Sequence, residues 1–72
     1  MGPVASQLLR AWERLMQTSP ERCTELWLQR WFKHLEAQGA VGDYTIEQTT
    51  RGFDIGWEEP SGMWAFIYLD LP

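Results

Sequence analysis

Few residues in this chain have the type and spacing that catalysis or metal binding requires. Cys23 is the only cysteine and His34 the only histidine, so one chain can form neither a disulfide nor a structural zinc site. His34 lies near the end of a predicted helix, where an imidazolium interacts favourably with the helix dipole. Cys23 lies on an apolar stripe of the same helix, which favours a buried thiol over a reactive one.

The carboxylates do not form a pattern that is typical of an active site either. Glu58 and Glu59 are neighbours in a turn before Pro60, whereas paired catalytic acids face each other across a cleft. No P-loop, dinucleotide-binding glycine motif, zinc-protease helix or EF-hand loop is present. We therefore predict a protein that is not an enzyme, with no catalytic residues, no cofactor and no metal site.

Length and composition indicate one small folded domain, residues 1–72. Hydrophobic residues make up 44% and charged ones 22%, which is ordinary globular usage, but five of the 72 residues are Trp. A core of this size supplies only about 3–5 kcal/mol, so a large aromatic core, self-association or both must stabilise it, and we expect a homodimer. No apolar run approaches the roughly 18 residues of a membrane span, so we expect a cytoplasmic protein without membrane contact.

The N-terminal half has the apolar spacing of two helices, at residues 4–17 and 20–38. Ser19 is a favourable N-cap for the second helix, and Pro20 suits its first position. Gly39 is placed to end that helix in a left-handed conformation. The apolar arc of the second helix is wider than the sheet alone can bury. We expect most of it to lie in the core, with the remainder available as a self-association surface.

From residue 43 onward the apolar period changes to the alternation of strands. We predict strands at residues 44–50, 53–58 and 63–70, joined by a two-residue turn at Arg51-Gly52 and a second turn at 59–62. The predicted fold is α+β, with an N-terminal helical hairpin packed on one face of a three-stranded antiparallel β-meander.

Pairing across the two turns assigns the faces of the sheet. The face expected to meet the helices consists of Tyr44, Ile46, Phe53, Ile55, Trp57, Met63, Ala65, Ile67 and Leu69. Trp57 should be buried at the centre of this face, where both helices can reach it.

The opposite face carries the aromatic residues of the third strand, Trp64, Phe66 and Tyr68, on the same side as Glu47 and Asp54. Trp64 is expected to cover the bare backbone of Gly56. A shift of one residue in the second hairpin would exchange the faces of the third strand. In that alternative the three aromatic residues form the core, and Met63, Ala65 and Ile67 lie outside.

Charge is divided unevenly between the halves, with a net charge of +1 over residues 1–42 and −5 over residues 43–72. An acidic sheet repels phosphate, which disfavours nucleic acid as a ligand of that sheet. We predict a small acidic interaction module (a regulator, adaptor or inhibitor) that binds another protein with a basic surface. The predicted partner-binding residues are Trp64, Phe66, Tyr68, Asp54 and Glu47.

Two other functions remain open from the sequence. One is nucleic-acid binding through basic residues of the second helix, namely Arg22, Arg30 and Lys33. The other is a role as an accessory subunit of an enzyme complex.

Overall fold

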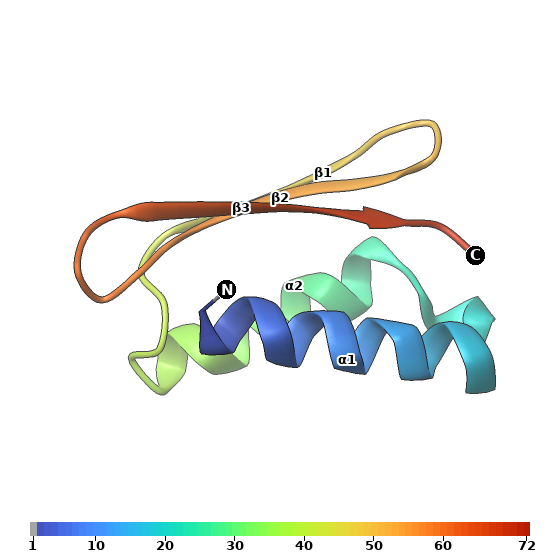
Figure 1. The fold of residues 1–72 in the computed structure, drawn as a ribbon, viewed down its shortest axis with the longest axis horizontal. Helices are drawn as coiled ribbons and strands as arrows, with labels where there is room; N and C mark the ends of the chain where they lie inside the picture. The colour runs from blue at the N-terminus through green and yellow to red at the C-terminus, as the bar shows by residue number, and fades with distance from the viewer. Residues whose placement is uncertain (1) are drawn as a thin grey trace.

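The computed structural model describes residues 2–72. The chain forms α1 (Pro3–Thr18), a short 3-10 helix η1 (Pro20–Arg22), α2 (Glu25–Ala37), β1 (Tyr44–Gln48), β2 (Gly52–Glu58) and β3 (Trp64–Asp70). The strands form one antiparallel sheet in the order β1-β2-β3. Both α-helices lie on the same side of this sheet, which confirms the predicted α+β fold (Figure 1).

The first helix has the predicted extent to within one residue at each end. Pro3 occupies the first turn, where its missing N–H costs no hydrogen bond. The buried residues of α1 follow a helical period along one side: Val4, Leu8, Trp12 and Leu15. Trp12 also donates its indole N–H to the carbonyl oxygen of Asp70 at 2.8 Å, which ties α1 to the end of β3.

The second α-helix begins at Glu25, so the predicted start at Pro20 was wrong. Pro20 opens only the 3-10 turn, which the N–H of Cys23 closes on the Pro20 carbonyl at 3.1 Å. Thr24 then adopts an extended conformation and accepts a hydrogen bond from the N–H of Trp27 at 3.2 Å. Because Thr24 is a stronger cap in this geometry than Ser19, whose side chain makes no capping bond, the helix restarts after it.

The C-terminus of α2 is the one predicted. Gly39 has φ 74°, and its N–H donates to the carbonyl of Glu36 at 3.0 Å. The N–H of Ala40 donates to the carbonyl of Leu35, also at 3.0 Å. These two bonds satisfy carbonyl groups that the helix end would otherwise leave unpaired. Neither α-helix in the described part of the chain is of the length and apolarity that a bilayer span requires.

The first hairpin turn lies at Thr50-Arg51, whereas Arg51-Gly52 was predicted. The N–H of Thr49 donates to the carbonyl of Gly52 at 2.8 Å and closes the turn, so β1 ends at Gln48. Gly52 does not have a positive φ. Its lack of a side chain is required for another reason, because a Cβ there would collide with the carbonyl oxygen of Leu69.

The second hairpin also differs from the predicted pairing by two residues. Trp57 pairs with Ala65 rather than with Met63, because the turn extends through Gly62, which has φ 90°. Met63 lies in this turn and is 72% exposed, so its predicted place on the inner face was wrong. A shift of two residues keeps every side chain on its face, and the remaining face assignments are therefore unaffected.

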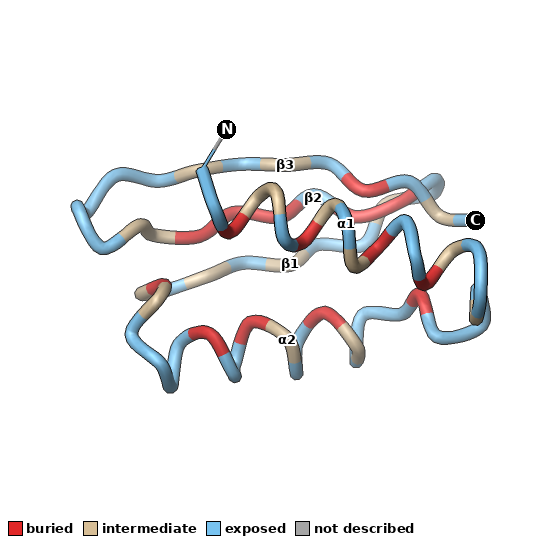
Figure 2. The backbone as a smooth tube through the Cα atoms, turned by 60° about the horizontal axis from the view of Figure 1, so that its bottom comes forward, coloured by how far each residue is buried: buried red, intermediate tan, exposed pale blue. Residues whose placement is uncertain are grey.

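The core lies between the helices and the inner face of the sheet (Figure 2). Its sheet side consists of the buried residues Phe53, Ile55, Trp57 and Leu69, flanked by the half-buried Tyr44, Ile46, Ala65 and Ile67. Trp57 is 1% exposed and packs against Phe32 of α2 at a ring distance of 5.6 Å, which confirms its predicted central position. The Trp57 indole Nε1 has no hydrogen-bond partner among residues 2–72.

Candidate functional site

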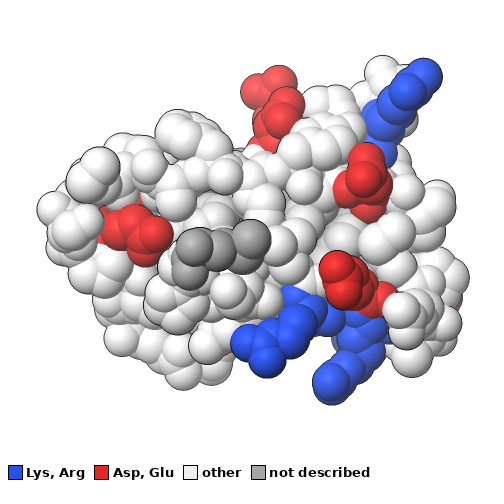
Figure 3. Space-filling view, viewed as in Figure 1, with Lys and Arg blue, Asp and Glu red and all other residues white. Residues whose placement is uncertain are grey.

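The helices leave one side of the sheet uncovered within residues 2–72, and we call this side the outer face (Figure 1). Its side-chain positions include Thr45, Glu47, Asp54, Gly56, Trp64, Phe66 and Tyr68, and the same alternation places Glu58 and Asp70 on this side. The five residues predicted to bind a partner are thus together on one surface. In the side view of Figure 3, basic side chains lie over α1, on the side away from this face, and at the upper right beside the hairpin end of the sheet.

The three aromatic side chains of the outer face are accessible. Trp64 is 42% exposed, Phe66 77% and Tyr68 44%. On the same strand Leu69 is buried, and Ala65 and Ile67 pack against the core. The alternative register, in which these aromatic residues form the core, is therefore wrong.

Two of the aromatic rings form a stacked pair over the bare backbone of β2. The rings of Trp64 and Phe66 are 6.2 Å apart with an interplanar angle of 23°. Phe66 pairs with Gly56, and a Cβ on Gly56 would approach the Phe66 ring to 2.8 Å. The prediction of an aromatic cover over Gly56 is confirmed, but Phe66 supplies it and not Trp64, because the register differs by two residues.

Tyr68 is fixed at the other end of the face. It pairs with Asp54, and its hydroxyl shares a hydrogen bond of 3.2 Å with Oγ1 of Thr49. The ring also lies close to Gly52, where any side chain would meet it. These contacts restrict the rotamers of Tyr68 although much of its surface remains exposed.

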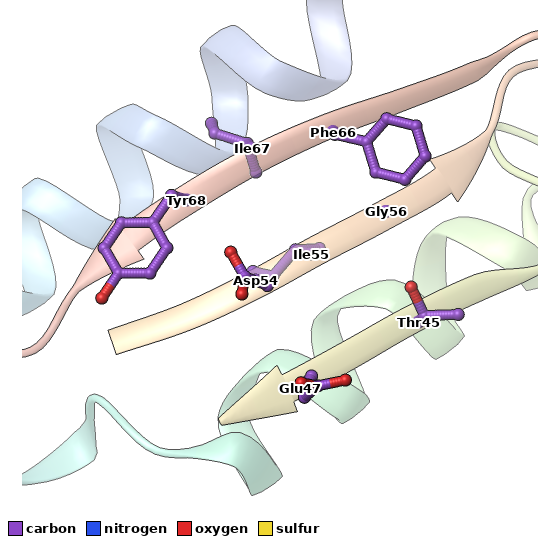
Figure 4. A pocket seen from close by; sticks show the side chains of 8 residues that line it. All are labelled: Thr45, Glu47, Asp54, Ile55, Gly56, Phe66, Ile67 and Tyr68. Carbon is purple, nitrogen blue, oxygen red and sulfur yellow. The ribbon is translucent and has the colours of Figure 1, made fainter. Parts of the chain in front are cut away.

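A shallow depression of about 430 Å³ lies between Phe66 and Tyr68, and Asp54 and Glu47 line it (Figure 4). Glu47 and Asp54 are direct cross-strand partners on β1 and β2. Like charges in this position repel each other. The three strands contain no Lys or Arg that could neutralise them on this face.

Residues with catalytic chemistry lie elsewhere and are dispersed. Cys23 is 6% exposed, as predicted, but it precedes α2 instead of lying in its first turn. Burial, and secondly the carboxylate of Glu21, raise the pKa of the Cys23 thiol and keep it protonated. His34 is exposed on α2, with its Nε2 at 3.2 Å from the side-chain nitrogen of Gln38. Within residues 2–72 no three His, Cys, Asp or Glu side chains come together as metal ligands.

A second concave surface lies on α2, and the sequence predicted its basic residues as the alternative nucleic-acid site but not its aromatic ones. Trp27 and Trp31 stack at 6.3 Å with an interplanar angle of 18°, and both are only half-buried. They line a groove of about 520 Å³ together with Arg22 and Arg30. The wide apolar arc of the second helix is the sequence signal for this groove. Apolar spacing predicts most of this arc in the core, because it does not show how much of the arc the neighbouring elements cover.

No family model, curated protein or solved structure matches this chain, so its own geometry has to carry any functional argument.

Proposed function

We propose that the protein is a non-catalytic protein–protein interaction module that binds a partner with a basic surface through the outer face. The observation that carries this proposal is the exposure of Trp64, Phe66 and Tyr68 beside Asp54 and Glu47, on the side of the sheet that no helix of the described residues covers. A regulator, adaptor or inhibitor that acts by occupying a partner's surface needs no catalytic group of its own.

The chemistry of the outer face matches that of known binding surfaces. Trp and Tyr are over-represented among the residues that dominate binding energy, and charged groups usually surround such an apolar centre. Trp64 stacks against Phe66, and the Tyr68 hydroxyl shares a hydrogen bond with Thr49. Because these contacts already limit the rotamers of Trp64 and Tyr68, those two side chains lose less entropy on binding.

Net charge supports a basic partner. The C-terminal half carries a net charge of −5, and Glu47 and Asp54 face each other without a cation on the strands. A positively charged surface would relieve this repulsion and would be attracted over a distance set by ionic strength.

Affinity capture from a native extract tests this function, with Phe66→Ser as bait beside the unchanged chain. Met63→Ser is the matched control, because Met63 is equally exposed but lies in the turn and not on the outer face. We expect Phe66→Ser to lower recovery of the captured protein at least about tenfold. Recovery that is equal with both variants contradicts the proposal. A captured enzyme that loses activity without this chain would indicate the accessory-subunit function.

Nucleic-acid binding is the second candidate, because Arg22 and Arg30 share one groove with the stacked Trp27 and Trp31. Bases stack on aromatic rings, and phosphates pair with guanidinium groups. Lys33 lies beside a different groove with Tyr44, so only two of the three predicted basic residues line this surface. A mobility shift with single-stranded RNA at low salt that disappears in Arg30→Ser would support this function. No shift at low salt contradicts it.

A further inference from the structure

The backbone of β3 bonds to β2 through alternate residues. Just beyond one end of the strand pair, the N–H of Glu59 donates to the carbonyl of Met63 at 2.7 Å. Just beyond the other end, the N–H of Leu71 donates to the carbonyl of Arg51 at 2.8 Å. In an antiparallel pair such bonded positions recur at every second residue, so the odd-numbered residues of β3 bond to β2. The backbone N–H and C=O groups that point away from the sheet belong to Trp64, Phe66, Tyr68 and Asp70.

Among residues 2–72, only one of these outward positions has a hydrogen-bond partner. The carbonyl of Asp70 accepts the indole N–H of Trp12. No group among residues 2–72 forms a hydrogen bond with the backbone of Trp64, Phe66 or Tyr68 on this side. The free edge therefore spans these three residues.

This edge lacks the features that usually prevent another strand from adding to it. β3 contains no Lys and no Pro, and its pairing with β2 runs from Trp64 to Asp70 without a bulge. The single charged residue of β3 is Asp70, at the end of the strand. An added strand would meet neither repulsion nor steric hindrance from β3 itself.

The same three residues supply both the free backbone groups and the exposed rings. A strand that pairs with this edge would place every second side chain on the outer face, beside Trp64, Phe66 and Tyr68. A long side chain there can cross β3 towards Asp54 on the adjacent strand β2, and Glu47 adds its negative charge from β1 beyond it. Arg and Lys have the required length, and their cationic groups interact with both aromatic rings and carboxylates.

We infer that β3 accepts an extended segment of a partner protein as a fourth strand, with Arg or Lys at the positions on the outer face. The inference rests on the proposed function and specifies its mode of recognition. Charge selects this occupant over a second copy of the chain, because β3 has no basic side chain to neutralise Glu47 and Asp54. Backbone pairing contributes affinity, and the acidic depression selects the basic side chains.

The test uses the full chain to select binders from a phage-displayed random peptide library. Enriched peptides are then titrated into isotopically labelled protein, and amide hydrogen exchange is followed by NMR. We expect enriched sequences in which Arg or Lys alternates with apolar residues. We also expect the exchange of the Trp64, Phe66 and Tyr68 amides to slow at least about tenfold on binding.

Two substitutions at Phe66 distinguish the contribution of the backbone edge to peptide binding from the contribution of the aromatic ring. Phe66→Ala removes the ring, and Phe66→Pro removes in addition an N–H that does not bond to β2. Both should fold, and Phe66→Pro should bind the enriched peptide about tenfold more weakly than Phe66→Ala. Ile67→Pro removes an N–H that does bond to β2, so it should lower the melting temperature more than Phe66→Pro.

The other outcomes overturn the inference in distinguishable ways. Basic peptides that perturb the outer face, leave the edge amides unprotected and bind both Phe66 variants equally would leave only the proposed function standing. Edge amides that are already protected in the peptide-free chain, together with a dimer by sedimentation, would assign the edge to a second copy. Failure to enrich any peptide that contacts the outer face would contradict both proposals.

Discussion

Trp57 and Phe66 are both large aromatic residues on neighbouring strands, yet 1% of Trp57 is exposed and 77% of Phe66. Trp57 lies on the inner face and packs against α2, whereas Phe66 covers a glycine on the outer face. Residues of one type thus contribute differently on the two faces of the sheet. The inner aromatic residues supply burial, from which a small domain gains most of its stability, and the outer ones are free to contact other molecules.

The largest expected effect is a loss of stability when the aromatic side chain at the centre of the inner face is removed. Trp57→Ala should reduce the free energy of unfolding by about 3–5 kcal/mol, which approaches the whole stability of a domain of this size. Trp57→Phe should cost much less, because it keeps a ring in place and removes an indole N–H that has no partner among the described residues. Urea unfolding followed by circular dichroism measures both. A Trp57→Ala protein that unfolds at nearly the same urea concentration as its parent would contradict the assignment of the inner face.

A pH titration examines a second buried group, Cys23. Its pKa is raised in the folded chain, so on alkalinisation the unfolded chain releases the thiol proton first. The unfolded state then binds fewer protons, and the free energy of unfolding falls as pH rises from the ordinary thiol pKa towards the raised one. Below the ordinary pKa the effect vanishes. Urea unfolding across this range should show the decline, and Cys23→Ala should lack it; equal slopes for the two proteins would contradict a buried thiol.

Gly56→Ala alters the outer face with little expected change in stability. The new Cβ would lie 2.8 Å from the exposed Phe66 ring, which can swing aside, so the free energy of unfolding should change by about 1 kcal/mol or less. Because the displaced ring changes the shape of the depression, binding of partner or peptide should weaken. Chemical denaturation and a binding titration on the same sample measure the two effects. A large loss of stability would show that Phe66 is held as firmly as a core residue.

The smallest expected effect has the opposite sign. Asp54→Asn removes the repulsion from Glu47 and should stabilise the fold by about 0.2–1 kcal/mol at low salt, while it weakens binding to a basic partner. Asp43→Asn is the control, because Asp43 is exposed and precedes β1. Thermal unfolding at low and high salt measures the effect: at low salt the melting temperature should rise more for Asp54→Asn than for Asp43→Asn. A destabilised Asp54→Asn would mean that the carboxylate has a structural role.

The sequence predicted the layers of the fold and the faces of the strands because these depend on periodicity. Both hairpins differ from the predicted register by two residues, and alternation keeps the faces through such a shift. The turn at Thr50-Arg51 was missed because Gly52 was interpreted as a turn residue. A glycine is required at position 52 because the backbone of Leu69 on β3 approaches it closely. The local sequence does not show such a contact between strands.

The candidate site was predictable to a similar extent. Alternation alone placed Trp64, Phe66 and Tyr68 with Asp54 and Glu47 on one surface. It did not show which ring covers Gly56, since that depends on register, nor that Trp27 and Trp31 line a groove, since that depends on how α1 and the sheet cover α2.

The central claim, that the aromatic residues of β3 form a binding surface and not a core, is tested most directly with Phe66→Ser and Tyr68→Ser combined in one chain. The double variant should keep the circular dichroism spectrum of the parent and a cooperative unfolding transition, because both side chains lie outside the core. It should at the same time lose the partner or peptide that the parent binds. A double variant that unfolds, or one that folds and binds as tightly as the parent, would contradict the account.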